Sequence, residues 1–287
     1  MTTLAASQDL APYVPRLATE LAGRPGASWT SIEGSMLSAD ISGFTALSEK
    51  LAGKGKAGAE EITSLINTCF TALIDSAYDY RGEVIKFGGD ALLVLFRGDD
   101  HERRCANASL AMQIALHSSP AAKRANLTMT VGASHGPFDV FMVGSGYREL
   151  LIIGPAASNV IFLEGEADKG ETLISPEIAE HVPAHMLGRE HAGGLAVSGE
   201  AFDPPMDPDP RPWLSEDLTP FVPPQVVEQL SAFAELGGEH RIVSVGFVLV
   251  AGVKDQLDTV GPQGTADALA GLIDGILAAT APYGVTA

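Results

Sequence analysis

Residues 36–45 read MLSADISGFT and residues 82–96 read GEVIKFGGDALLVLF, and these two stretches decide the fold. The first is a short apolar strand that ends near Asp40, just before a glycine where the chain must turn. The second is a pair of apolar runs around Gly88-Gly89-Asp90, a pattern typical of a β-hairpin. The sequence therefore predicts a strand and a hairpin that each carry one aspartate at a tip.

The segments around these two stretches alternate between helical and extended patterns. A helix is predicted over 62–74, where seven residues fall on one apolar face: Ile62, Leu65, Ile66, Cys69, Phe70, Leu73 and Ile74. A second helix follows the hairpin, and further strands and a helix are predicted at 127–133, 138–143, 149–153, 155–166 (helix) and 172–174. The order strand, helix, strand, strand, helix, strand predicts an α+β fold, a ferredoxin-like βαββαβ sandwich with extra strands at its end.

The composition divides the chain into four segments. Residues 1–30 are predicted to form a leading helix and a loop, and residues 31–198 the main domain. Eight prolines lie between residues 204 and 224, so residues 199–224 are predicted to be an extended linker. Residues 225–287 repeat the helix and apolar-strand pattern, with a strand over 240–250, and are predicted to begin a second, incomplete domain of the same kind.

The net charge excludes one class of partner. The chain has 18 Lys and Arg against 36 Asp and Glu, which gives a formal charge of −18. A surface this acidic repels phosphate backbones, so nucleic acid is not an expected partner. A nucleotide remains possible because one bound metal ion can reverse the local field.

The sequence favours a soluble protein of a reducing compartment. Only two cysteines are present, Cys69 and Cys105, so no disulfide framework is expected. The N-terminus lacks the pattern of a signal peptide, and the longest apolar stretch, Ile242 to Val253, is shorter than the roughly 20 residues that cross a bilayer. We therefore expect a cytoplasmic protein with no membrane span.

Asp40, Asp90 and Lys86 are the residues most suggestive of chemistry. If the first strand pairs with the hairpin, the two carboxylates converge, and such a pair suits two hard cations held with a triphosphate. Taken singly, a helix cap at Asp40 and a turn residue at Asp90 are the favoured interpretations. Lys86 lies inside an apolar strand, where it either faces an anion or extends to solvent at a strand edge.

Three other features are weak candidates. The basic segment Gly53 to Gly58 lacks the Gly-Lys-Ser/Thr ending of a P-loop and is predicted to be a solvated loop that at most brushes phosphates, and Ser145 does not lie in a GxSxG motif. The histidines at 181, 185 and 191 lack an HExxH pattern, and Pro183 interrupts their spacing.

Two blocks resemble the catalytic domain of class III nucleotide cyclases: SADISGFTALSEKL at 38–51 and GEVIKFGGDALLVLF at 82–96. A third block, at 148–175, resembles the region around the family's GxxVNxAxR segment. The resemblance implies that Asp40, Asp90 and the backbone carbonyl of Ile41 hold two Mg²⁺ or Mn²⁺ ions. It also implies that the turn formed by Ile41, Ser42, Gly43, Phe44 and Thr45 surrounds the nucleotide phosphates.

The chain departs from the family at the residues that read the purine and stabilise the reacting phosphate. The family's Lys aligns with Lys86, its Asp or Thr with Leu151, its Asn with Ser158 and its Arg with Phe162. Leu151 accepts no hydrogen bond from a purine, and Phe162 cannot stabilise phosphate charge. The resemblance therefore implies a metal-bearing half that needs a second cyclase domain, in cis or in trans.

Within the family, the blocks resemble bacterial tandem cyclases and the soluble, bicarbonate-responsive type, whose first domain carries the aspartates. In the latter type the position of Lys86 faces a degenerate second pocket that binds an anion. The arginine that assists there aligns with Ile161, which argues against bicarbonate. Leu249 and Val250 stand near the position that corresponds to Asp40 in the second segment, which implies no metal ligand there.

The function implied by the resemblance is conversion of ATP to cyclic AMP and pyrophosphate, for cyclic-nucleotide signalling, with GTP less favoured. The alternative is a catalytically silent module that binds nucleotide or metal and regulates a partner. A diguanylate cyclase is disfavoured because Ala91-Leu92 follows Asp90 where that family has an acid and a phenylalanine.

Overall fold

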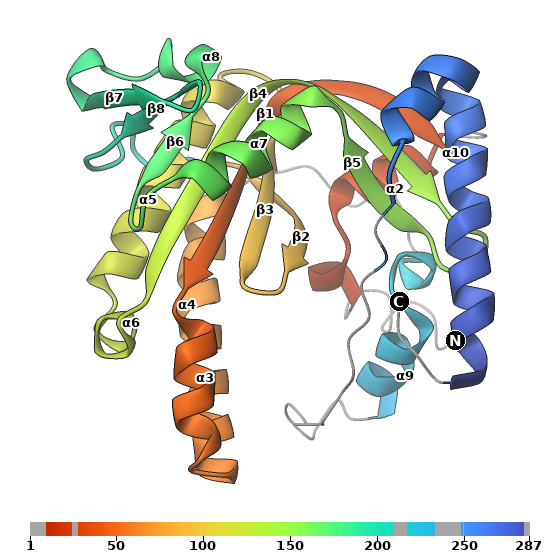
Figure 1. The fold of residues 1–287 in the computed structure, drawn as a ribbon, viewed down its shortest axis with the longest axis horizontal. Coiled ribbons are helices and arrows are strands. Elements are labelled where there is room, and N and C mark those ends of the chain that lie inside the picture. The colour runs from red at the N-terminus through yellow and green to blue at the C-terminus, as the bar shows by residue number, and fades with distance from the viewer. Residues whose placement is uncertain (1–9, 25–27, 209–216, 233–247, 249, 284–287) are drawn as a thin grey trace. The chain divides into compact units, whose positions relative to one another are not determined.

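The computed structural model describes residues 10–24, 28–208, 217–232, 248 and 250–283, which form a mixed α+β fold. Its sheet has eight strands in the order β2-β3-β1-β4-β6-β8-β7, and β5 pairs with β4 (Figure 1). The strands are β1 (Trp29–Ser42), β2 (Glu83–Gly88), β3 (Ala91–Phe96), β4 (Thr128–Val143), β5 (Glu149–Ile153), β6 (Thr172–Ile174), β7 (Leu187–His191) and β8 (Gly194–Val197).

The α-helices are α2 (Arg16–Ala22), α3 (Phe44–Ala52), α4 (Lys56–Tyr78), α5 (His101–Ser118), α6 (Pro120–Ala125), α7 (Pro155–Glu166), α8 (Pro176–Ala179), α9 (Pro224–Ala232) and α10 (Val253–Thr280). Helix α4 connects β1 to the β2–β3 hairpin, and α5 connects β3 toward β4. With the strand order β2-β3-β1-β4, this connectivity is the ferredoxin-like βαββαβ arrangement. The predicted fold class is confirmed.

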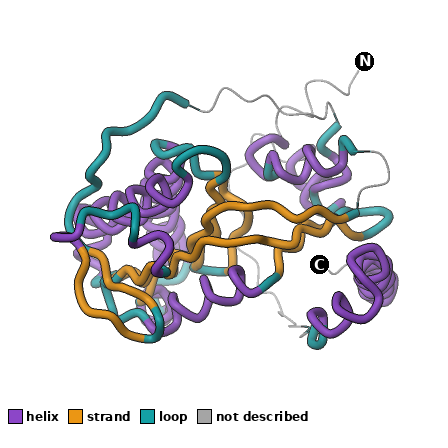
Figure 2. Tube along the Cα trace, turned by 90° about the horizontal axis from the view of Figure 1, so that it is seen from above, coloured by secondary structure: helices purple, strands orange, loops and turns teal. Residues whose placement is uncertain are grey.

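The alternating direction of the side chains along β1 explains how this strand both packs in the core and carries Asp40. Leu37, Ala39 and Ile41 of β1 belong to the hydrophobic core that includes residues of α4 and α5. Because successive strand residues point to opposite faces, Ser38 and Asp40 lie on the other face of β1. Figure 2 shows helices on both sides of the strands. Asp40 is therefore carried by a strand whose opposite face is anchored in the core.

Helix α7 lies unusually close to β4. A Cβ atom placed on Gly132 would come within 2.2 Å of the backbone nitrogen of Glu164 and 2.4 Å of the carbonyl oxygen of Val160. No side chain fits into that distance, so this approach requires glycine at residue 132. Thr130 Oγ1 donates a hydrogen bond to Glu164 Oε1 at 2.7 Å, which fixes the helix along the strand.

The prediction of two strands at 127–133 and 138–143 is wrong, because β4 runs unbroken through both segments. Gly136 absorbs the change in backbone direction with φ +149°. Ala133 and Phe138 on either side are fully buried, which keeps the chain in the sheet across Pro137. The predicted strands at 149–153 and 172–174 correspond to β5 and β6, whereas the hairpin of β7 and β8 was not predicted.

A buried arginine joins three chain segments near the start of α5. Arg104 donates from Nη2 to the carbonyl oxygen of Arg97 at 2.6 Å and from Nε to that of Asp99 at 3.0 Å. Its Nη1 donates to the carbonyl oxygens of Tyr80 and Arg81, at 3.3 and 3.4 Å. These bonds tie the turn after α4 and the loop after β3 to α5.

Residues 199–208, the described first part of the predicted linker, are extended and form hydrogen bonds with the main fold. Arg103 donates two hydrogen bonds to the Asp203 carboxylate, at 2.6 and 2.7 Å. Asn107 donates to the same carboxylate at 2.8 Å, and Tyr80 donates to the backbone carbonyl of Asp203 at 2.9 Å. Proline content alone could not reveal these contacts.

The chain divides into two compact units. One comprises residues 32–138 and 153–211, and the other comprises residues 1–31, 139–152 and 212–287. In the second unit, Asp274 of α10 accepts a hydrogen bond from the backbone of Ser145 at 2.9 Å, and Trp29 Nε1 donates to Asp139 at 3.1 Å.

The predicted boundaries at 30, 198 and 224 stay predictions, as does the second cyclase-like domain. The predicted helices in 225–287 correspond to α9 and α10. Most of the predicted strand over 240–250 lies outside the described residues. Val248 and Val250, which are described, are exposed and have no regular structure.

One helical segment, Val253–Tyr283, is long and apolar enough by composition to cross a membrane. That criterion is also met by helices of soluble proteins, so it supports a span only weakly. Gly261 has non-helical angles (φ +73°, ψ 176°) before Pro262, so the helix is interrupted after its first two turns.

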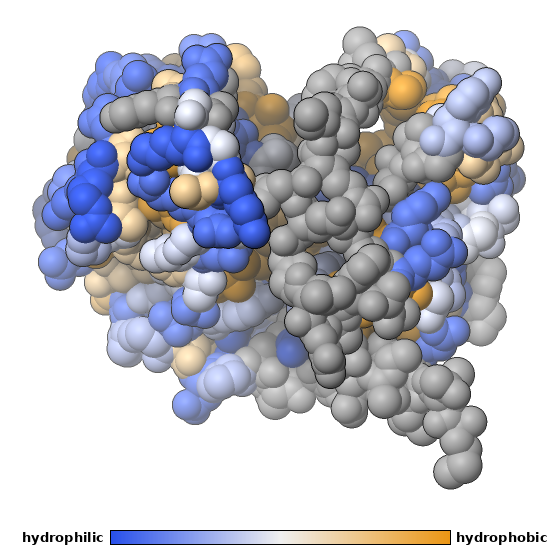
Figure 3. All heavy atoms as spheres, turned by 90° about the horizontal axis from the view of Figure 1, so that it is seen from below, coloured by the Kyte–Doolittle hydropathy of each residue, from blue (hydrophilic) through white to orange (hydrophobic). Residues whose placement is uncertain are grey.

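The face of the molecule drawn in Figure 3 is rich in hydrophilic residues, as expected for a chain with a net charge of −18.

Candidate active site

The backbone brings Asp40 and Asp90 together. Asp40 lies near the end of β1 and pairs with Ala91, the first residue of β3. The next amide, Ile41 N–H, donates to the carbonyl oxygen of Asp90 at 3.1 Å. Gly89 has φ +73°, which allows the tight turn that places Asp90 beside β1. The expected convergence of the strand tip and the hairpin tip is therefore present.

The two carboxylates interact directly. The pKa of Asp40 is raised to about 6, first because burial disfavours its charged form, then because of the negative charges of Asp90 and Glu164 and a hydrogen bond with Asp90. A shared proton or a cation relieves this repulsion. Hard divalent cations prefer such carboxylate oxygens, so the donor set fits Mg²⁺ or Mn²⁺.

Sequence reasoning missed Glu164. It lies on α7, and its charge reaches Asp40 because α7 packs directly on β4 at Gly132. No motif in the sequence indicates that Glu164 lies near Asp40, which stands 124 positions earlier. A third carboxylate strengthens the negative potential that a metal ion would neutralise.

The segment after Asp40 forms the turn that the resemblance assigns to the phosphates. Gly43 has φ +111° and precedes Phe44, the first residue of α3. Ile41 and Phe44 are buried, whereas Ser42 and Gly43 are more accessible. Backbone N–H groups at a helix start attract anions, which is compatible with a phosphate role for residues 41–45. That role stays a prediction.

Lys86 lies on β2, the terminal strand in the order of the sheet. Its side chain is exposed, between buried Ile85 and half-exposed Phe87. The register of β2 against β3 shifts between Val84 and Lys86, so the strand is irregular at this point. An anion-facing Lys86 stays a prediction.

Ser158 and Phe162, to which the resemblance assigns the positions of the family's Asn and Arg, lie on one accessible side of α7. Ser158 is exposed, and 52% of Phe162 is accessible. The adjacent Asn159 does not replace the missing amide, because its Nδ2 donates to Ser134 of β4 at 3.0 Å. Leu151 lies on β5 and is partly buried.

The weaker candidates behave as ordinary structural residues. His191 pairs with Glu171 at 3.2 Å. Lys54, in the short connection between α3 and α4, pairs with Glu61 at 2.8 Å, so the predicted solvated loop is brief. Within the described residues, the group of His, Cys, Asp and Glu side chains arranged to hold a metal comprises His101, Glu102 and His135.

Comparisons with known proteins agree with the motifs. A sequence family described as "Adenylate and Guanylate cyclase catalytic domain" matches residues 31–201. Adenylate cyclase type 10 of Mus musculus is 27% identical over 152 residues, and that of Homo sapiens is 25% identical over 152 residues. Each alignment covers 50% of this chain and 9% of the relative, so the chain spans about a tenth of the length of these relatives.

Solved structures support the fold. A bacterial light-regulated adenylyl cyclase superimposes with a TM-score of 0.54 at 21% identity, covering 66% of this chain and 58% of that one. A guanylyl cyclase superimposes with a TM-score of 0.50 at 21% identity, covering 63% of this chain and 100% of that one.

Proposed function

Since the chain belongs to the family of adenylate and guanylate cyclase catalytic domains, we propose that it is the metal-bearing half of a class III cyclase that converts ATP to cyclic AMP and pyrophosphate. The observation that carries this proposal is the convergence of Asp40 and Asp90, with the raised pKa of Asp40. ATP is preferred over GTP because the curated relatives are named adenylate cyclases.

In the proposed reaction, the ribose 3′-oxygen attacks the α-phosphorus in line with the leaving pyrophosphate. The new O3′–P bond forms as the bond from the α-phosphorus to the bridging oxygen breaks, and the hydroxyl proton passes to solvent. Two Mg²⁺ or Mn²⁺ ions would supply charge neutralisation and lower the pKa of the hydroxyl. Asp40, Asp90 and the carbonyl of Ile41 would hold them.

The chain's own backbone would orient the triphosphate. Gly43, with φ +111°, immediately precedes α3, and the first amides of that helix could donate to phosphate oxygens. Glu164 would keep the site strongly negative until the cations arrive. Nucleotide binding is therefore expected to require the metal.

The missing groups would come from a second cyclase domain, in cis or in trans. Phe162 and Ser158 stand where the family has Arg and Asn, and Asn159 is already bonded to Ser134. A partner domain would supply the purine-reading residues and the arginine that stabilises the transition state. We place this assembly in the cytoplasm, where ATP is abundant and the buried Cys69 and Cys105 stay reduced.

The second candidate is a silent regulatory module that binds nucleotide or metal without turnover. The exposed Phe162 favours it, because an apolar side chain cannot perform the role of the family's arginine. The two candidates share the metal site and differ in whether a complementary domain restores catalysis.

The test is calorimetric titration of the full chain with Mn²⁺ and a non-cyclisable ATP analogue. We expect Asp40→Asn and Asp90→Asn each to abolish metal-dependent nucleotide binding, because each removes a ligand charge from one shared site. Asp168→Asn, an exposed acid paired with Arg189, is the matched control and should bind normally. Unchanged affinity in either site variant would exclude a shared metal site.

A further inference from the structure

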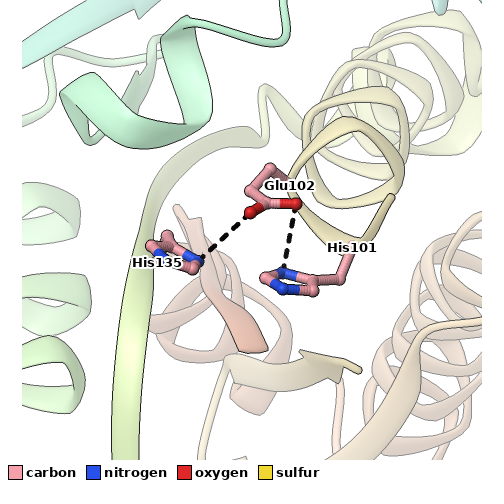
Figure 4. A group of neighbouring side chains, drawn as sticks. All are labelled: His101, Glu102 and His135. Carbon is pink, nitrogen blue, oxygen red and sulfur yellow. Dashed lines mark ion pairs between the residues drawn. The ribbon is translucent and has the colours of Figure 1, made fainter. Parts of the chain in front are cut away.

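The side chains of His101, Glu102 and His135 converge on one another (Figure 4). The first two open α5, and His135 projects from β4. One Glu102 carboxylate oxygen lies 3.5 Å from His101 Nδ1, and the other lies 3.5 Å from His135 Nδ1. The two imidazole rings stack nearly parallel, with centroids 5.2 Å apart. Their side chains are only 12–20% accessible, so water screens the cluster little.

His135 brings an unsatisfied nitrogen to the cluster. His135 Nδ1 is buried and has no hydrogen-bond partner in the structure. Nδ1 lies 3.5 Å from the Glu102 carboxylate, and Nε2 lies 3.5 Å from the carboxylate of Glu33, whose side chain is 69% accessible. With the proton on Nε2, Nδ1 presents a lone pair beside Glu102, and a cation between the two would satisfy both acceptors.

His101 offers its Nδ1 to the same cluster, 3.5 Å from the Glu102 carboxylate. Its Nδ1 lies 3.0 Å from Ser35 Oγ, whose hydroxyl can donate to the lone pair when no ion is present. A metal ion would replace that weak donor.

We propose that His101, Glu102 and His135 form a binding site for a borderline divalent transition metal, of which Zn²⁺ is the best match. Two imidazoles and one carboxylate are preferred zinc donors, at about 2.0–2.2 Å from the ion. Tetrahedral ligands at that distance lie about 3.3–3.6 Å from one another. The two measured contacts with Glu102 are 3.5 Å, and all three ligand atoms lie within 4.8 Å of one another, so small side-chain rotations complete the site.

Glu33 acts as the outer support of this site. A carboxylate that accepts from the second nitrogen of a metal-bound histidine fixes the tautomer and raises the basicity of the ligand nitrogen. The 3.5 Å separation of Glu33 Oε1 from His135 Nε2 provides this arrangement. With three protein ligands, a fourth position is left for water.

This site is separate from the proposed catalytic metal site and does not depend on the proposed function. Ser35, which contacts His101, is buried and has the strand parity of Leu37 and Ala39 in the core, whereas Asp40 lies on the opposite face of β1. Ser35 and Asp40 are five residues apart, which is about 17 Å along a strand. The ligand types differ too, since all-oxygen donors suit Mg²⁺ and imidazoles suit Zn²⁺. An ion here would tie the start of α5 to β4.

The test is competition for Zn²⁺ between the full chain and a chromophoric chelator, in a chain that also carries Asp40→Asn and Asp90→Asn. Those two substitutions remove binding at the catalytic carboxylates. We expect one Zn²⁺ per chain, and a higher melting temperature when Zn²⁺ is present. Co²⁺ in its place should give the visible bands of a tetrahedral ion. No binding by this chain would overturn the proposal.

Variants assign the ligands. His101→Ala and His135→Ala should each weaken Zn²⁺ binding by at least about 100-fold, and Glu33→Gln by about 10-fold, as expected for an outer carboxylate. His191→Ala removes a histidine that is also paired with a glutamate, Glu171, and should leave affinity unchanged. If a histidine variant fails to fold, Glu102→Gln makes the same test with smaller disturbance. Unchanged affinity in Glu102→Gln would overturn the assignment.

Discussion

At the scale of single residues, the candidate site holds carboxylates that repel one another. Asp40 is partly buried beside Asp90 and Glu164, and its pKa is raised to about 6 in the folded chain. In the unfolded chain the same carboxyl has its ordinary pKa of 3.8. The metal-free protein is therefore less stable at neutral pH than it would be without the Asp40 charge, a cost typical of functional sites.

We expect Asp40→Asn to stabilise the metal-free chain. Above about pH 6 the folded carboxyl is charged and the full penalty applies, so the gain in unfolding free energy is largest there. As the pH falls through 6 toward 3.8, the folded carboxyl is protonated and the gain shrinks toward zero. Urea unfolding in chelator at pH 7.5 and pH 4 measures this difference. A gain that is equal at both pH values would contradict the assigned cause.

The sequence could predict a contact between two residues only where both residues belong to recognisable local motifs. Asp40 and Asp90 lie at the tips of a strand and a hairpin that pair with each other, so their meeting follows from the predicted topology. Glu164 depends on how α7 docks on Gly132, and His135 meets His101 only after β4 and α5 pack. Neither contact leaves a periodic pattern in the chain.

At the scale of elements, the close packing of α7 on β4 depends on Gly132. We expect Gly132→Ala to lower the unfolding free energy by about 1–3 kcal/mol, the usual cost of overpacking, because the new Cβ would meet the α7 backbone. The displaced helix would also carry Glu164 away from Asp40. Urea unfolding measures the loss.

The control for this prediction is Gly165→Ala, which lies in α7 itself. A Cβ at Gly165 meets nothing within 4 Å, so alanine there should be neutral or slightly stabilising. Equal destabilisation by both substitutions would show that the close approach at Gly132 is not the cause.

Elements with strong apolar patterns were predictable, and those set by tertiary contacts were not. The β2–β3 hairpin, α4 and α7 follow from periodicity and glycine positions. The break predicted between the strands at 127–133 and 138–143 does not occur, because burial on both sides keeps the chain in the sheet. The binding of Asp203 to Arg103 and Asn107 could not be seen in a proline-rich segment.

At the scale of the whole molecule, we expect the 287-residue chain alone to have very low cyclase turnover. It lacks the arginine and asparagine of the family at Phe162 and Ser158, and removal of one preorganised donor typically lowers the rate by about 10²–10³. Adding a complementary cyclase domain that carries those residues should raise turnover by at least about 10⁴.

A cyclase assay with Mn²⁺ and ATP, then GTP, checks this expectation. The same mixture with Asp40→Asn is the control and should stay inactive. Turnover on the order of 1 s⁻¹ from the chain alone would show that the alignment of residues 148–175 with the family is wrong. Metal-dependent binding without any turnover in the mixture would favour the regulatory module.

The arginine that fastens the start of α5 has a consequence for how this protein can change over generations. Four acceptors of Arg104 are backbone carbonyl groups, at residues 80, 81, 97 and 99. Every amino acid has a backbone carbonyl, so the side chains at these positions can change without removing an acceptor as long as the backbone keeps its path, which includes φ +54° at residue 81. Lysine at residue 104, with one compact ammonium group, could not span the same acceptors. We therefore expect inherited sequence changes to be tolerated better at the acceptor positions than at residue 104.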